Sequence, residues 1–164
     1  MFSETVPPCS GRRIAMKKRS PKTKVQRNTA VLSVSPLAED YVSLQAVLDP
    51  SKWELHKSNS VVSALAVIRR WDISVVICEQ VLSPGTWNDM LSELSVLRIV
   101  PPLIVTSRLA DEKLWVEALN LGAYDVLAKP FDRAELVRIV LGAVASVPSA
   151  GVPAKVVNVM QAAS

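Results

Sequence analysis

The sequence predicts a doubly wound α/β fold, in which helices cover both faces of one parallel sheet. Two observations support this prediction. Short β-rich runs alternate with segments of helical period from Thr29 onward, and three of the runs are almost continuously apolar. Continuous apolar runs are typical of parallel strands that crossover helices bury on both faces. Five rounds of the alternation predict five strand–helix units between residues 29 and 147.

The five predicted strands differ in their pattern of apolar residues. "WELHK" at 53–57 alternates apolar and polar residues, which predicts a strand at an edge of the sheet or one that is partly wetted. The other four are "AVLSV" at 30–34, "SVVIC" at 74–78, "PLIVT" at 102–106 and "AYDVLA" at 123–128.

Apolar residues recur at spacings of three and four between these runs, which predicts helices with one apolar stripe each. The fourth helix is expected to stop at Gly122, and Asp132 is expected to cap the fifth, with Glu135 completing a pair like a capping box. The stripes are Leu37, Tyr41, Leu44 and Leu48; Val61, Leu65 and Ile68; Leu114, Ala118 and Leu121; and Leu136, Ile139, Val140 and Ala143.

Charge and apolar pattern together divide the chain into three regions. Residues 1–28 hold eight Lys and Arg against Glu4 alone, so this segment carries +7 and the remainder −3 of the net charge of +4. It has little apolar periodicity, which predicts a disordered basic arm. Residues 29–147 form the predicted domain, and residues 148–164 read as a flexible tail because Pro, Gly, Ala and Val mix there without a sustained period.

Several functional classes are disfavoured by composition. No apolar run reaches the roughly 18 residues of a membrane-spanning helix, and no secretory signal follows the basic start, so we expect a cytoplasmic protein. Cys9 and Cys78 are too few and too far apart for a disulfide framework or a zinc site, and Cys78 reads as an inert core residue. His56 is the only histidine, which argues against histidine catalysis. The tryptophans are interpreted as packing residues, with a position facing a partner left open for Trp115: Trp53, Trp71, Trp87 and Trp115.

Three short motifs follow the last three predicted strands in turn. They are a Pro-Gly turn after the third strand, Thr106 at the end of the fourth and "KPF" at the end of the fifth. Together with "CEQVLSPGTW" and "GAYDVLAKPFDRAEL", they resemble the receiver domain of bacterial response regulators over about residues 30–147. The resemblance implies a flavodoxin-like (βα)5 fold with strand order 2-1-3-4-5. It also implies a role in two-component or phosphorelay signalling.

The resemblance assigns a role to each site position of the family. In receivers, an aspartate after the third strand accepts a phosphoryl group, a nearby acidic pair helps to bind Mg²⁺, and a hydroxyl and a lysine contact the phosphoryl oxygens. The matching positions here are Glu79 for the acceptor, Thr106 for the hydroxyl, Lys129 for the lysine, Ser35 and Pro36 for the acidic pair, Pro130 for a cis-proline and Val126 for the aromatic switch.

The departures from that pattern predict a degenerate receiver. Ser35 and Pro36 remove two of three carboxylates, so we expect weak or absent Mg²⁺ binding and no other cofactor. Glu39 and Asp40 follow in the first predicted helix, where they are expected to cap or solvate its first turn without pointing at Glu79.

Three interpretations of Glu79 stay open. It is a displaced nucleophile, a fixed charge that imitates a phosphorylated aspartate, or one half of a semi-buried ion pair with Lys129. A carboxylate carries about one negative charge where a phosphoryl group carries closer to two, so the imitation is partial.

The leading hypothesis is therefore a pseudo-receiver that acts by protein contact through its fourth helix, fifth strand and fifth helix. Its expected partner is a histidine kinase, another regulator or a second copy of the chain, and no membrane. The alternative is a nucleic-acid-associated regulator that binds phosphate through residues 12–27. An enzyme is not expected, because no G-x-G-x-x-G motif or Walker loop follows the first strand.

Overall fold

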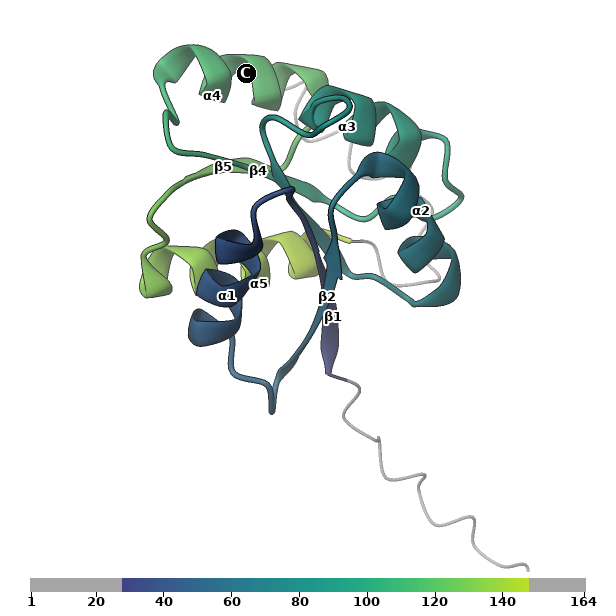
Figure 1. Cartoon of the computed structure of the whole chain (residues 1–164), viewed down its shortest axis with the longest axis vertical. Coiled ribbons are helices and arrows are strands. Elements are labelled where there is room, and N and C mark those ends of the chain that lie inside the picture. The colour runs from purple at the N-terminus through teal and green to yellow at the C-terminus, as the bar shows by residue number, and fades with distance from the viewer. Residues whose placement is uncertain (1–27, 148–164) are drawn as a thin grey trace, which may run out of the picture.

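The computed structural model describes residues 28–147, in which five strands and five helices alternate along the chain (Figure 1). The strands form one parallel sheet in the order β2-β1-β3-β4-β5, which confirms the predicted fold and strand order. The predicted tails, 1–28 and 148–164, lie outside the described residues except for Asn28. The strands are β1 (Thr29–Val34), β2 (Trp53–Ser58), β3 (Val75–Glu79), β4 (Leu103–Ser107) and β5 (Asp125–Ala128). The helices are α1 (Ala38–Val47), α2 (Val61–Arg70), α3 (Trp87–Ser95), α4 (Glu112–Leu121) and α5 (Arg133–Ser146).

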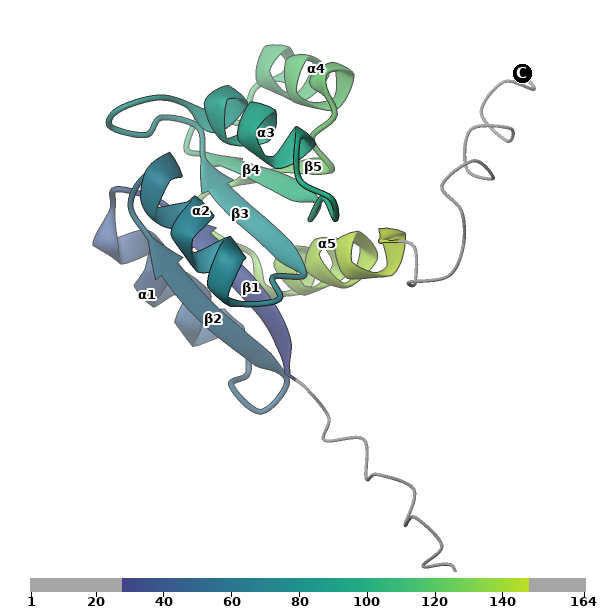
Figure 2. The same cartoon turned by 90° about the vertical axis from the view of Figure 1, so that its right-hand side faces the viewer.

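The helices form two layers around the sheet (Figure 2). Side chains from α1 and α5 pack on one face, where Val31 and Ile77 of the sheet meet Leu44 and Leu136. Side chains from α2, α3 and α4 pack on the other face, against alternate sheet residues such as Cys78. Because successive strand residues point to opposite faces, one apolar run such as β3 supplies both cores. Each fully buried Leu or Ile contributes about 1.5–3 kcal/mol to this packing.

Helix ends follow the predicted signals. The Asp132 carboxylate accepts a hydrogen bond from the Glu135 N–H at 2.9 Å, although the Glu135 side chain does not return the bond that would complete the predicted capping box. α4 ends at Gly122 with a left-handed φ of 109°. Ser60 and Ser63 form a capping box at the start of α2. The prediction of an edge strand at 53–57 is also confirmed, since β2 has only β1 beside it.

Some packing predictions were wrong. Leu37 precedes α1 as its N-cap, and Leu121 is the last residue of α4 and extends past the sheet, so both side chains are exposed. Among the tryptophans, Trp53 and Trp87 are buried as predicted, but Trp71 and Trp115 are 44% and 45% exposed. The physical reason is position: Trp71 ends α2 at the rim of the sheet, and Trp115 points away from the core stripe of Leu114 and Ala118.

Within residues 28–147, no helix is long and apolar enough to cross a membrane.

Cys78 is completely buried in the core, as predicted. Burial, with a smaller contribution from the Glu79 carboxylate, raises the pKa of the Cys78 thiol far above its usual range. This thiol is therefore protonated and unreactive in the folded chain.

Candidate functional site

The carboxyl ends of β3, β4 and β5 bring three of the predicted site residues together. Glu79 ends β3 and lies beside its register partner Thr106 on β4. The Thr106 hydroxyl donates a hydrogen bond to Glu79 Oε2 at 3.3 Å. Lys129 follows β5, and its Nζ forms an ion pair with the same Glu79 oxygen. In a parallel sheet these carboxyl ends share one edge, which explains why residues up to 50 positions apart meet here.

Asp40 also belongs to this cluster, contrary to the expectation that it would only cap or solvate α1. Its Oδ2 lies 2.6 Å from Lys129 Nζ and 2.5 Å from the Ser35 hydroxyl, which donates to it. The reason is the helix period. Asp40 lies one and two turns before Leu44 and Leu48, which are buried against the sheet, so all three share its inner side. This spacing of four was the signal in the sequence that could have identified Asp40.

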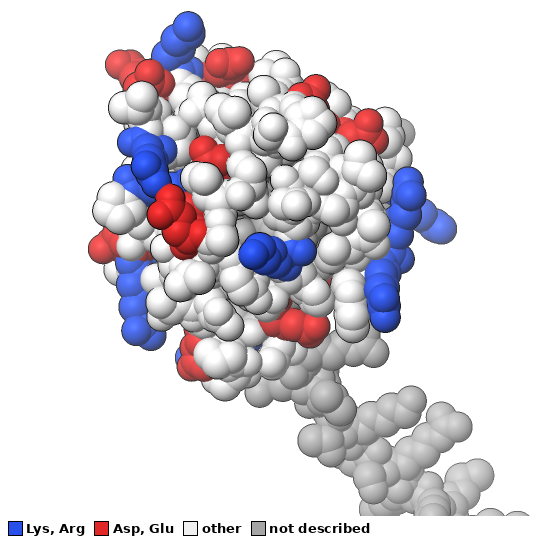
Figure 3. Space-filling model, in the orientation of Figure 1, with Lys and Arg blue, Asp and Glu red and all other residues white. Residues whose placement is uncertain are grey.

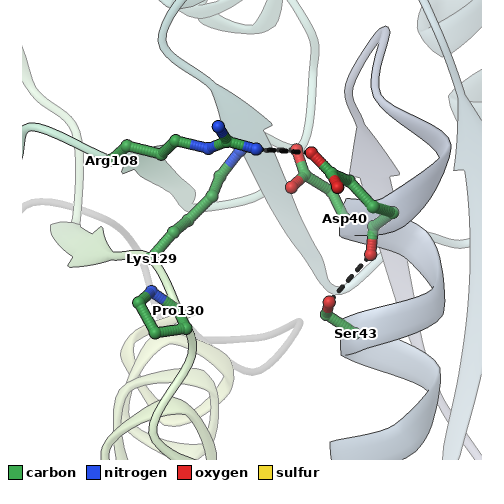
Figure 4. A pocket seen from close by; sticks show the side chains of 6 residues that line it. Asp40, Ser43, Arg108, Lys129 and Pro130 are labelled. Atoms are coloured by element: carbon green, nitrogen blue, oxygen red, sulfur yellow. Dashed lines mark hydrogen bonds and ion pairs between the residues drawn. The ribbon is translucent and has the colours of Figure 1, made fainter.

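Glu39, one residue earlier, faces outward as expected. Its carboxylate pairs with Arg108 Nη2 at 2.5 Å, and these side chains are 63% and 69% exposed. Together with Asp40, Ser43, Lys129 and Pro130 they line a cavity of about 300 Å³ (Figure 4). In this view Lys129 extends from the end of β5 toward α1, and Arg108 reaches across the cavity to the same helix.

The remaining predicted positions lie nearby or beneath the site. Ser35 is buried, and its hydroxyl accepts a hydrogen bond from the Leu37 N–H at 3.1 Å in addition to its bond to Asp40. Pro36 is exposed, and the Lys129–Pro130 bond is cis, as the resemblance implied. Val126 is buried in the core shared with α3 and α4.

A second polar link between β3 and β4 was missed by the sequence reasoning. The Ser107 hydroxyl donates a hydrogen bond to Gln80 Oε1 at 2.7 Å and accepts one from the Leu109 N–H at 3.1 Å. The Gln80 N–H also bonds to the Thr106 carbonyl at 2.8 Å. These bonds continue the pairing of the two strands beyond Glu79, which holds the loop after β3 beside the cluster.

Charge in the cluster is concentrated and largely removed from water. The side chains of Asp40 and Lys129 are each 7% exposed, and that of Glu79 is 12% exposed. The Lys129 ammonium therefore forms ion pairs with two carboxylates, those of Asp40 and Glu79. Buried charges are tolerated only when they are paired, because an isolated charge loses its hydration without compensation. The shared lysine meets that requirement and ties α1 to the ends of β3 and β5.

The residues at this edge do not match the Mg²⁺ site of receivers. The acidic pair is replaced by a serine and an exposed proline, and both available carboxylates already bind the Lys129 ammonium. Within residues 28–147 no group of three or more His, Cys, Asp or Glu side chains is placed to hold a metal ion. Mg²⁺ prefers several hard oxygen ligands in octahedral geometry, which this donor set does not supply while Lys129 is paired with both carboxylates.

Comparison with known proteins gives consistent matches. The sequence pattern of the response regulator receiver domain matches residues 40–141, which is more than half of the chain. The DNA-binding transcriptional regulator NtrC of Rhizobium meliloti (strain 1021) is 28% identical over 108 residues, covering 63% of this chain. This chain spans only 22% of that relative.

Solved structures show the same fold. The signal receiver domain of an HD domain-containing protein from Pseudomonas fluorescens Pf-5 is 25% identical, with a TM-score of 0.65 over 73% of this chain and 88% of that one. The receiver domain of sensor histidine kinase PA1611 from Pseudomonas aeruginosa PAO1 is 23% identical, with a TM-score of 0.63 over 73% of this chain and 99% of that one. That structure has a magnesium ion coordinated in its active-site cleft.

Proposed function

Because this chain belongs to the family of response regulator receiver domains, we propose that it is a pseudo-receiver, which is not phosphorylated and signals by protein contact. One observation carries the proposal: the Lys129 ammonium is paired with both Asp40 and Glu79. In a receiver of the usual kind, the corresponding lysine contacts a phosphoryl group. Here it is engaged by carboxylates of the chain itself, and the module has no catalytic activity of its own.

The chemistry of phosphoryl transfer supports this proposal. Transfer depends mainly on positioning the acceptor and neutralising the charge that develops on the phosphoryl oxygens. Glu79 has one methylene more than aspartate, and its Oε2 already receives Thr106 and Lys129. An ångström of misplacement is costly in a reaction of this kind. With Asp40 and Glu79 both bound to one lysine, the edge also lacks the free carboxylates that would bind Mg²⁺ and neutralise the charge.

Treatment with acetyl phosphate and Mg²⁺, followed by Phos-tag electrophoresis, tests the proposal directly. We expect no shifted band for the wild type or for Glu79→Ala, while a receiver with an aspartate acceptor shifts in the same gel. Glu79→Asp tests the length of the acceptor side chain. A shifted band in this variant would show that the extra methylene of Glu79 is what prevents phosphorylation. Stoichiometric phosphorylation of the wild type that disappears in Glu79→Ala would refute the proposal.

The proposed contact surface lies on α4, β5 and α5, at the edge of the sheet that β5 forms (Figure 1). α4 exposes four large apolar side chains: Trp115, Val116, Leu119 and Leu121. Exposed aromatic residues beside aliphatic ones are typical of the centre of a protein interface. The expected partner is a histidine kinase, another regulator or a second copy of this chain.

Trp71 provides a matched control for that surface, because it is as exposed as Trp115 but lies at the end of α2. We expect Trp115→Ala to abolish capture of the partner from cells, or self-association in sedimentation, while Trp71→Ala leaves it intact. Glu79→Gln is measured in the same assay. Loss of capture in a folded variant would show that the partner senses the Glu79 charge, and unchanged capture would show that the charge only stabilises the fold. Equal loss in both tryptophan variants would argue against the α4 surface.

A second candidate function, nucleic-acid association, is favoured by the placement of basic residues. Arg69, Arg70 and Arg98 line a groove of about 420 Å³ at the amino ends of β3 and β4. Figure 3 shows Lys and Arg side chains gathered along the side of the molecule formed by α2. The basic segment 1–28 joins β1 at the same end of the sheet. This function predicts DNA binding that weakens steeply with salt and is lost when residues 1–28 are deleted. Binding that is indifferent to this deletion would remove the candidate.

A further inference from the structure

We infer that the Lys129 ammonium is the resident cation of this site, a tethered positive charge that occupies the place of a divalent ion and keeps such ions out. Removing it is then expected to create a cation site formed by Asp40 and Glu79. The inference rests on the proposed function, since it concerns the charge balance of the same site. It is tested by metal binding rather than by phosphorylation.

The geometry supports a single cation position. Lys129 Nζ contacts Asp40 Oδ2 from α1 and Glu79 Oε2 from β3, so the two carboxylate oxygens converge on one point. Calcium–oxygen distances of about 2.3–2.6 Å are close to the 2.6 Å between Nζ and Asp40, and magnesium–oxygen distances are about 2.0–2.1 Å. Small adjustments of two side chains would therefore bring both oxygens to ligand distance of an ion at the ammonium position.

The charges explain exclusion in the wild-type chain. With Lys129 present, Asp40 and Glu79 together leave one net negative charge, and the ammonium repels a second cation at short range. Arg108 adds another positive charge at the rim of the cavity, held there by Glu39. Without Lys129, two largely buried carboxylates face each other and gain strongly from any cation that joins them.

The adjoining cavity provides space for the rest of a coordination shell. Asp40 and Lys129 line it, and its volume of about 300 Å³ exceeds the share of several water molecules, each about 30 Å³. Two carboxylate oxygens plus waters would complete a hydrated divalent ion, since Mg²⁺ commonly keeps several waters. Thr106, already bonded to Glu79, holds that carboxylate toward the same point.

Titration with Mn²⁺, followed by the electron paramagnetic resonance signal of the free ion, tests the inference on the full chain. We expect Lys129→Ala to bind one Mn²⁺ at least about tenfold more tightly than the wild type, and Mg²⁺ to compete for it. The added substitution Asp40→Asn is expected to abolish the gain. Arg108→Ala is the matched control, because it also removes one positive charge but leaves both carboxylates paired with Lys129. An equal gain in Arg108→Ala would overturn the inference in favour of a general charge effect.

Folding is monitored by circular dichroism in the same titration, because Lys129→Ala leaves two carboxylates without a cation. A variant that folds only when Mn²⁺ is added would support the inference. One that stays unfolded at every Mn²⁺ concentration would count against it, since the ion then cannot replace the ammonium. Wild-type Mn²⁺ binding that Asp40→Asn removes would also overturn it. The two proposals can fail separately. If wild type binds Mn²⁺ but is not phosphorylated, the inference fails and the proposed function stands. If wild type is phosphorylated, the proposed function fails, whether or not Mn²⁺ binds.

Discussion

Asp40 and Lys129 are expected to be energetically coupled, and a double-mutant cycle measures that coupling. The substitutions are Asp40→Asn and Lys129→Met, made singly and together. Asn retains an oxygen that can accept the Ser35 hydroxyl, while Met retains most of the lysine stem without its charge. The cycle therefore changes charge while preserving most of the packing.

The structure sets the expected magnitudes. Lys129→Met leaves two carboxylates, 7% and 12% exposed, without their cation, and removing one partner of a buried pair costs about 3–5 kcal/mol. Asp40→Asn leaves Lys129 paired with Glu79, so the loss is that of one charge-assisted hydrogen bond, about 1.5–3 kcal/mol at most. The double variant leaves one unpaired carboxylate instead of two. We therefore expect it to be more stable than the sum of the single effects predicts, by about 1–3 kcal/mol.

Urea unfolding followed by tryptophan fluorescence provides the assay, since Trp53 and Trp87 are buried in the folded chain. A loss of about 4 kcal/mol lowers the midpoint by roughly 2 M at a typical urea dependence. The exposed pair Glu39–Arg108 is the control, because its atoms are equally close but such pairs contribute about 1 kcal/mol or less. Additive single effects, or the same coupling free energy in both pairs, would refute the reasoning that burial strengthens the coupling between Lys129 and Asp40.

Three further predictions concern the core and the helices. In a Cys9→Ser background, the Cys78 thiol should not react with Ellman's reagent at pH 8 until urea unfolds the chain, because burial raises its pKa; rapid labelling of the native protein would contradict this. Gly142→Ala should destabilise the wild type, since the new Cβ would lie 2.6 Å from the Tyr124 hydroxyl oxygen. In a Tyr124→Phe background the same change should instead stabilise α5 by about 0.5–1 kcal/mol, and an unchanged sign in thermal unfolding would disprove the clash. Ser60→Ala should lower the free energy of unfolding by about 1 kcal/mol through loss of the α2 cap, and an unchanged melting temperature would speak against that role.

Local patterns were enough to predict most of the fold. The apolar runs that became β1, β3 and β4 are buried on both faces, as parallel strands require, and the alternating run "WELHK" became the edge strand β2. Gly122 and Asp132 were identified as helix boundaries because their effects act within a few residues. The order of the strands came from the resemblance, since no local pattern states which strands are neighbours.

Packing between elements decided what local patterns left open. Trp53 and Trp71 are the same residue type, yet one is buried and the other half exposed, because only the first lies on the inner side of a sheet covered by a helix. Leu121 continues the helical period of α4 but extends past the sheet that covers Leu114 and Ala118. Periodicity indicates that a helix has an apolar face, but the length of that face depends on what it packs against.

The candidate site divides in the same way. The sequence alone placed Glu79, Thr106 and Lys129 at the ends of predicted strands, and the resemblance made those strands neighbours, because parallel strands bring their carboxyl ends to one edge of a sheet. Only the tertiary structure placed Asp40 beside them, since that depends on how the first turn of α1 lies against the ends of β3 and β5. The two carboxylates share one ammonium because of this placement, and the pairing compensates for the hydration that each buried charge loses.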